Sequence, residues 1–186
     1  MRMPALLLAM LTTACAGPPA SVHGFAGASE VPPTGEVKLS GGGEFSTSDT
    51  SAIAYDRKLV PQGAQASVTV ESSGNKTRTA LVVEGLLPNH HYGVHLHTKP
   101  CGAKPDDSGP HYQHRRGEIS PSSEVWLDVT TNGDGGGRST ARNDWALDPL
   151  NPPGSLVLHS QPTKTSGPEV GTAGVRVACL TLKKVP

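Results

Sequence analysis

The chain has 186 residues, long enough for one domain with a hydrophobic core. Its 22 glycines and 17 prolines are too many for long helices, and its 16 basic and 16 acidic side chains give a formal charge of zero. This balance, with no basic stripe, argues against a nucleic-acid partner. No apolar run reaches the roughly 18 residues that a membrane-spanning helix needs. Short segments of alternating polarity separate the glycines and prolines, which favours an all-β sandwich or barrel.

The N-terminus is predicted to be an export signal. Arg2 supplies a positive charge, and residues 5–11 form a short apolar stretch. Small residues then precede Cys15, an arrangement that resembles a bacterial lipoprotein signal, in which the cysteine becomes the lipidated first residue. The alternative is an ordinary secretory signal cut near Ala16, with Cys15 discarded. Both alternatives export the domain. The first also anchors it through lipid on Cys15 to the outer face of a bacterial membrane, at the cell surface or in the periplasm.

Three segments follow from this assignment: a signal over 1–14, the lipidated cysteine and a tether over 15–50, and a β domain over 51–186. The tether segment is rich in glycine, serine, proline, threonine and alanine. Such a chain behaves as a flexible coil, and this length spans about 30 Å on average. Phe25 and Phe45 are the aromatic residues of this segment, and neither is expected to anchor the core.

Beyond residue 51, alternation of apolar and polar residues predicts a series of strands. In chain order these are 65–70, 79–84, 92–97, 125–130, 139–147, 155–160 and 174–182. Residues 98–123 form a long polar loop, of a length that is usually functional or disordered. Asn132 to Gly135 is a strong hairpin turn.

Two histidines in the strand 92–97 carry the main functional signal. Side chains at i and i+2 of a strand point to the same face, so Val94 and Leu96 would face the core while His95 and His97 lie side by side on the other face. Two imidazoles held in this way suit a metal ion, although the spacing alone is also compatible with a pair of exposed strand residues. Sites of nitrogen without thiolate suit copper, zinc, iron or nickel, and a tetragonal imidazole site favours Cu(II).

The chain has three cysteines. If Cys15 carries lipid, Cys101 and Cys179 remain in an oxidising compartment and should form one disulfide. The bridge would close a loop of about 80 residues and contribute about 2–4 kcal/mol in the chain-entropy account. It would tie the loop that leaves the histidine strand to the strand that carries Arg176.

Several motifs together resemble the Cu,Zn superoxide dismutases. Residues 93–97, Gly-Val-His-Leu-His, are similar to the copper-binding strand of that family, and Gly109-Pro110-His111-Tyr112 is similar to the segment with its bridging histidine. Residues 156–159 match the strand with the last copper histidine. Residues 171–179, Gly-Thr-Ala-Gly-Val-Arg-Val-Ala-Cys, resemble the signature that supplies the active-site arginine and one disulfide cysteine, and Cys101 occupies the place of the other. The resemblance covers about residues 51–184.

The resemblance implies an eight-stranded Greek-key β-sandwich or flattened barrel and a single copper ion per chain. Its implied ligands are His95, His97, His111 and His159. Arg176 would attract and hold the superoxide anion, which is converted to O2 and H2O2 as copper cycles between Cu(II) and Cu(I). His111 would detach on reduction and carry a proton.

The departures from the family are as informative as the matches. The family's zinc site takes two further histidines and an aspartate, but here the loop offers only His114, and Glu124 lies near the aspartate position. The connection from His159 to Arg176 is also short, so the family's charged electrostatic loop is missing. The sequence therefore resembles a copper-only branch without a zinc site. In place of zinc, Glu124, Glu118 or His114 is expected to orient the far nitrogen of His111.

Two functions remain open, with the oligomeric state undetermined. The first is a copper-dependent superoxide dismutase. The second is a non-enzymatic copper-binding lipoprotein that buffers or hands on copper with the same histidines. Arg176 favours the first, because copper storage needs no anion-binding cation, whereas the missing zinc site and electrostatic loop favour the second. A domain kept only for its sandwich is a third possibility, and the intact ligand set argues against it.

Overall fold

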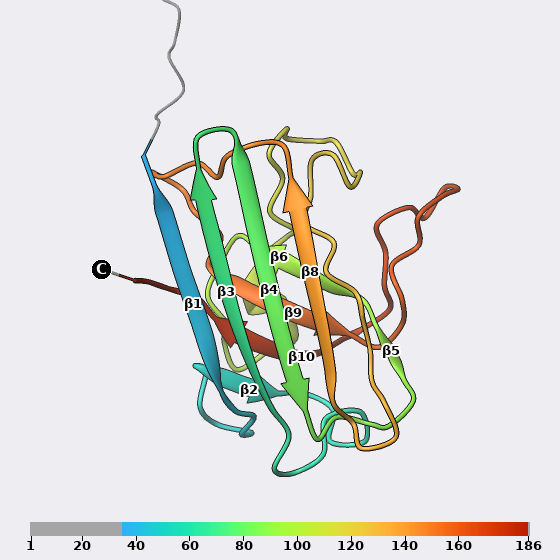
Figure 1. Ribbon diagram of the computed structural model, residues 1–186. Helices are drawn as coiled ribbons and strands as arrows, with labels where there is room; N and C mark the ends of the chain where they lie inside the picture. The colour runs from blue at the N-terminus through green and yellow to red at the C-terminus, as the bar shows by residue number, and fades with distance from the viewer. Residues whose placement is uncertain (1–34, 186) are drawn as a thin grey trace, which may run out of the picture. The chain divides into compact units, whose positions relative to one another are not determined.

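The computed structural model describes residues 35–185, and this part of the chain is built almost entirely from antiparallel strands (Figure 1). The strands are β1 (Val37–Glu44), β2 (Ala52–Ala54), β3 (Gln65–Ser73), β4 (Lys76–Glu84), β5 (His91–Tyr92), β6 (Val94–His97), β7 (Val129–Thr130), β8 (Gly137–Asn143), β9 (Ser155–His159), β10 (Arg176–Thr181) and β11 (Lys183–Lys184). A single 3-10 turn, η1 (Pro105–Ser108), is the one helical element within the described range. None of the helical segments in residues 35–185 is long and apolar enough to cross a membrane.

Two sheets form the body of the fold. One has the strand order β11-β1-β3-β4-β8 and the other β2-β10-β9-β6, while β5 and β7 make a short separate pair. In Figure 1 the strands of the second sheet pass behind those of the first. Neighbours in the sheets are mostly not neighbours in sequence, consistent with a Greek-key sandwich. The prediction of an all-β sandwich is confirmed, and without the three two-residue strands the described residues contain eight.

The core lies between the sheets and follows from period-two alternation. In β3, for example, Ala66, Val68 and Val70 are buried and the residues between them are exposed. The same pattern places Val94 and Leu96 of β6 in this core, opposite the first sheet. Fully burying one such side chain stabilises a fold by roughly 1.5–3 kcal/mol. The core of the sandwich is therefore built from aliphatic and aromatic side chains, and His95 and His97 lie outside it.

The predicted boundary between tether and domain was wrong. Strand β1 lies inside the segment 15–50, and Phe45, only 1% exposed, belongs to the core. The glycines that indicated a flexible coil allow close packing instead, because a Cβ atom at Gly41 would lie 2.7 Å from the carbonyl oxygen of Thr181. The signal, Cys15, Phe25 and the tether up to residue 34 lie outside the described residues.

Candidate metal centre

Strand β6 presents His95 and His97 on the outer face of its sheet. Val94 and Leu96 point into the core as predicted, so the two imidazoles point away from it. Both imidazoles are nevertheless fully buried. Strand β6 is the edge of its sheet, and its free edge is covered by two extended pieces of the following loop, through bridges from His97 to His111 and from His95 to Trp126.

Four histidines converge at this place. His111 lies on the bridged loop segment, and His159 is the last residue of β9, the strand next to β6. One ring nitrogen from each of His95, His97, His111 and His159 lies within 4.8 Å of the others, an arrangement able to hold a metal ion. The structure thus brings together all four residues that the sequence nominated as metal ligands.

Three of these rings have a buried nitrogen with no hydrogen-bond partner. The atoms are Nδ1 of His95, Nε2 of His97 and Nε2 of His159. A buried polar atom without a partner costs about 1–3 kcal/mol, so such atoms are rare in a finished core. Here they belong to one cluster, whose members offer nitrogen atoms to a common centre. The residues present therefore fit a metal ion bound by imidazole.

In two of these rings, those of His97 and His159, the other nitrogen is held by a backbone carbonyl. Nδ1 of His97 lies 2.9 Å from the carbonyl oxygen of Gly109, and Nδ1 of His159 lies 3.3 Å from that of Gly174. A carbonyl accepts only, so each of these nitrogens carries the proton and donates it. The remaining lone pair of each ring is then on Nε2, the atom left without a partner. Fixed tautomers of this kind are typical of metal-binding histidines.

The cluster favours neutral imidazoles. Burial is the main cause that lowers the pKa of His97 to about 2 and that of His159 to about 4. Burial also lowers the pKa of His95 well below its ordinary value, and the charges that neighbouring histidines would carry act in the same direction. At neutral pH these rings are uncharged, which is the form that binds a metal ion.

A stability test follows from these pKa values. In the metal-free protein we expect the melting temperature to be flat above about pH 6.5 and to fall as the pH decreases below it. Below about pH 6.5 the histidines of the unfolded chain bind protons, whereas in the folded protein the pKa values of His159 and His97 are about 4 and about 2. Protonation therefore favours the unfolded state as the pH falls. Scanning calorimetry at several pH values measures this. The exposed-surface variant His91→Gln should keep the same slope, and a melting temperature independent of pH would contradict the neutral assignment.

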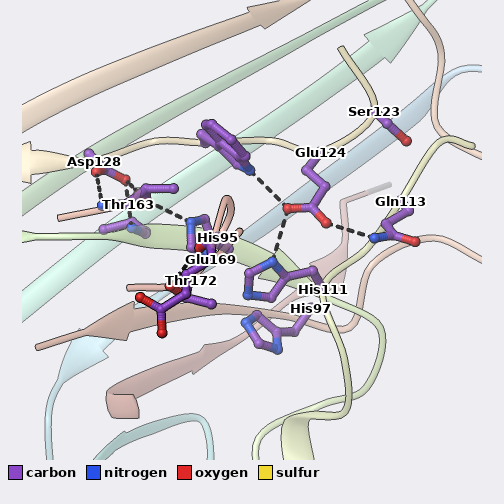
Figure 2. A network of polar contacts seen from close by, with 12 residues as sticks. His95, His97, His111, Gln113, Ser123, Glu124, Asp128, Thr163, Glu169 and Thr172 are labelled. Carbon is purple, nitrogen blue, oxygen red and sulfur yellow. Dashed lines mark hydrogen bonds and ion pairs between the residues drawn. The ribbon is translucent and has the colours of Figure 1, made fainter. Parts of the chain in front are cut away.

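Glu124 is the partner of His111. Its Oε2 atom accepts from His111 Nδ1 at 3.0 Å, while Trp126 Nε1 donates to the same oxygen and Gln113 Nε2 to Oε1, each at 2.8 Å (Figure 2). The carboxylate is only 1% exposed. Burial raises its pKa, but the three hydrogen bonds outweigh this effect and hold the pKa of Glu124 below its ordinary value. An ionised Glu124 keeps the His111 proton on Nδ1 and leaves Nε2 for the cluster.

The other two predicted partners of His111 lie elsewhere. Glu118 forms an exposed ion pair with Arg115, with an Nε to Oε2 distance of 2.6 Å. His114 stacks on Trp145, with ring centroids 4.9 Å apart and planes within 9°. Among the three candidates, Glu124 is the one that contacts His111 in the described part of the chain. The expectation for Glu118 and His114 is therefore not supported by the geometry.

Arg176 lies beside the cluster at the start of β10, where it pairs in register with His159. Its Nη1 atom donates to the carbonyl oxygen of Pro105 at 3.0 Å and to Ser108 Oγ at 2.9 Å. Both partners belong to η1. The Asp106 Oδ1 atom lies 3.9 Å from the same Nη1 atom. The side chain is 20% exposed, so the guanidinium is held in place yet still reaches solvent.

The predicted Cys101–Cys179 disulfide is present. It lies on the same outer face as the histidines, since Cys179 pairs with Val157 on β9 and Val157 pairs in turn with His95 on β6. Ile53, Cys101, Val157 and Cys179 form a small apolar cluster separate from the main core. Disulfides persist in oxidising compartments, so this bridge indicates an extracytoplasmic environment.

Two residues at the centre escaped the sequence analysis. Asp128 and Thr163 form a hydrogen-bonded pair that reaches His95. Asp128 could have been predicted to lie on the same face as Glu124, because side chains at 124, 126 and 128 of an extended segment point the same way. The segment forms isolated bridges at 124 and 126 and enters strand β7 only at Val129, so the predicted strand 125–130 is mostly an irregular edge. Thr163 had no sequence signal.

Fold and site together define a β-sandwich with a cluster of four histidines, able to hold a metal ion, on the outer face of one sheet. Among solved structures, the chain is similar to the Cu/Zn superoxide dismutase from Brucella abortus, with 18% identity and a TM-score of 0.52. The match covers 78% of this chain and 97% of that one. At this identity the likeness shows a shared superoxide dismutase-like fold. No family model and no curated protein sequence matches the chain.

Proposed function

We propose that this protein is an extracytoplasmic copper-dependent superoxide dismutase that works without zinc. The observation that carries the proposal is the set of three buried, unpartnered imidazole nitrogens with the Arg176 guanidinium on the neighbouring strand. The histidines supply a redox-metal site, and the arginine supplies a fixed positive charge for a small anion. Copper storage needs the first feature and has no use for the second.

Copper is the metal that this donor set suits best. All four candidate ligands are imidazoles, and neither thiolate nor carboxylate is among them. Such a set suits Cu(II), whereas closed tetrahedral zinc sites commonly include cysteine. When bound, copper would oxidise one superoxide to O2 and reduce a second to H2O2, with the uptake of two protons.

The chain's own residues hold the site and bind the anion. His95, His97 and His159 are fixed by buried strands, so they keep their positions in both oxidation states. Arg176 attracts superoxide and donates hydrogen bonds to it, as a guanidinium suits small anions. Its Nη1 atom is already held by η1, which leaves the other guanidinium N–H groups for the substrate.

His111 is the proposed proton carrier. Its Nδ1 proton is held by Glu124, so Nε2 is the atom that can bind metal or take a proton. When Nε2 is protonated, the Glu124 carboxylate stabilises the imidazolium, and the proton is then available to the reduced anion. Glu124 thus takes the orienting role that zinc has in a two-metal site, and a zinc ion is not required.

The proposed location is the outer face of a bacterial membrane, with the domain anchored by lipid on Cys15. The disulfide on the metal-bearing sheet supports an oxidising compartment. The lipid anchor itself is inferred from the N-terminal sequence. Mass spectrometry of the protein purified from membranes would detect the modified Cys15.

One experiment tests the function. Residues 16–186 are purified, loaded with copper with and without added zinc, and assayed for metal content and superoxide dismutation. We expect a single copper ion per chain, no stoichiometric zinc and activity independent of zinc. Copper bound tightly, with activity no greater than that of free copper, would instead assign the protein to copper buffering. Stoichiometric zinc beside copper would overturn the copper-only proposal.

Arg176→Ala is expected to retain copper and lower the dismutation rate by about tenfold or more, with a weaker dependence on ionic strength. The reason is that the guanidinium supplies steering and binding of the anion without contacting the four metal-binding nitrogens. Rates measured by pulse radiolysis at several salt concentrations test this. Arg176→Lys, which keeps the charge, should lose less activity than Arg176→Ala. An unchanged rate in Arg176→Ala would show that the residue only anchors η1.

A further inference from the structure

A short polar chain leads away from the metal centre through His95. The Nε2 atom of this ring lies 2.7 Å from Thr163 Oγ1, and Thr163 Oγ1 donates to Asp128 Oδ1 at 2.6 Å (Figure 2). Thr163 is 8% exposed and lies in the connection between β9 and β10. His95 differs here from His97 and His159, whose outer nitrogens bond directly to backbone carbonyls.

The Asp128 carboxylate determines which group donates in each of these two hydrogen bonds. An aspartate carboxylate accepts hydrogen bonds and a hydroxyl has a single proton to give. Thr163 therefore donates to Asp128, and its oxygen is left to accept from His95 Nε2. The proton of neutral His95 is then on Nε2, and the lone pair is on Nδ1. Nδ1 is the buried atom of this ring that has no partner and belongs to the cluster.

Asp128 is in turn held by two backbone groups. The amide of Val94 donates to Oδ1 at 3.1 Å, and the amide of Thr163 donates to Oδ2 at 2.7 Å. Val94 precedes His95 on the metal strand, so a single carboxylate joins that strand to the β9–β10 connection. Gly93 permits this approach, since a Cβ atom there would overlap Ala173 and lie 3.0 Å from Thr163 Oγ1.

We propose that Thr163 and Asp128 are positioning residues that hold His95 in the tautomer whose Nδ1 binds the metal. This inference rests on the metal site of the proposed function, but it does not require superoxide to be the substrate. A hydroxyl that relays to a carboxylate does for His95 what a backbone carbonyl does for His97 and His159. It also makes the short β9–β10 connection part of the metal centre, although none of its residues is a ligand.

The test compares two substitutions of one residue in the copper-loaded protein. Thr163→Ser keeps the hydroxyl, while Thr163→Val keeps the shape and removes it. We expect Thr163→Val to lower the affinity for Cu(II) by about 10–100-fold, measured by competition with a chelator, and Thr163→Ser to stay close to the parent. Thr172→Val is the matched control: Thr172 lies in the same connection, but its hydroxyl donates to the Glu169 carbonyl. The control should leave copper affinity unchanged.

A second measurement reads the tautomer directly, and its result in the parent protein is already decisive. Nitrogen-15 NMR of the metal-free protein should show His95 protonated on Nε2 in the parent and in Thr163→Ser. In Thr163→Val the Nδ1-protonated form should appear. A parent protein with the His95 proton on Nδ1 overturns the proposal, whether or not Thr163→Val folds. Equal copper affinity in Thr163→Val and Thr163→Ser overturns it as well.

The outcomes separate this proposal from the proposed enzyme activity. If the tautomer and the affinity difference are found but copper-loaded protein does not dismutate superoxide, the positioning role stands and the enzyme assignment fails. If activity is high and both Thr163 variants bind copper equally, the enzyme assignment stands and the positioning role fails.

Discussion

His159→Ala is expected to eliminate tight copper binding and reduce superoxide dismutation to background. His159 ends β9 and offers a buried Nε2 atom with no other partner, so its removal deletes a ligand from the centre of the cluster. The loss of copper affinity should exceed the roughly 10–100-fold typical of residues that only support a ligand. Metal analysis after dialysis against a weak chelator, with an activity assay on the same sample, measures both effects.

The matched control is His91→Ala, because His91 is exposed on β5 and contacts Thr130 rather than the cluster. This variant should bind one copper ion and keep full activity. Full copper occupancy in His159→Ala would remove His159 from the ligand set. Circular dichroism of both variants would verify that the sandwich is intact, as expected from a core that does not include the histidines.

The second large effect concerns the disulfide. Replacing Cys101 and Cys179 together with serine is expected to lower the free energy of unfolding by about 2–4 kcal/mol. The bridge spans 78 positions, so its loss restores many conformations to the unfolded chain. For a domain of this size the melting temperature should fall by about 5–15 °C. Denaturation curves of residues 16–186, which lack Cys15, measure the change without interference from a third thiol.

A reducing agent provides the control for this prediction. It should lower the melting temperature of the parent protein and leave the serine variant unaffected. Copper affinity should also fall in the variant, because Cys179 is joined to His95 through Val157 across the sheet. A parent protein whose melting temperature does not respond to reduction would show that the bridge contributes nothing to stability.

Much of the centre could be predicted because strand geometry is strongly encoded in sequence. The i, i+2 spacing of His95 and His97, with Val94 and Leu96 between them, determines which face each side chain takes. His111 and His159 could be added from their motifs, and the cysteines from their number. These are local or pairwise signals, and the sandwich follows from the same alternation in other strands.

The parts that sequence could not give depend on packing between distant segments. Strand β1 was missed because its glycines look like those of a linker, and only the carbonyl of Thr181 beside Gly41 shows why they are needed. Glu124 could not be separated from Glu118, since both lie near His111 in sequence and only the fold buries one of them. Thr163 carries no motif, and its role depends on Asp128 being brought next to it.

The position of the metal centre has a consequence for how the protein matures. The centre lies on the outer face of the β6 sheet, whereas the core between the sheets is complete without any histidine. If the protein is the exported copper enzyme proposed here, the chain could therefore leave the cytoplasm without metal, fold, form its disulfide and acquire copper last. The supply of copper at the destination, rather than the rate of folding, would then determine how much of the protein is active.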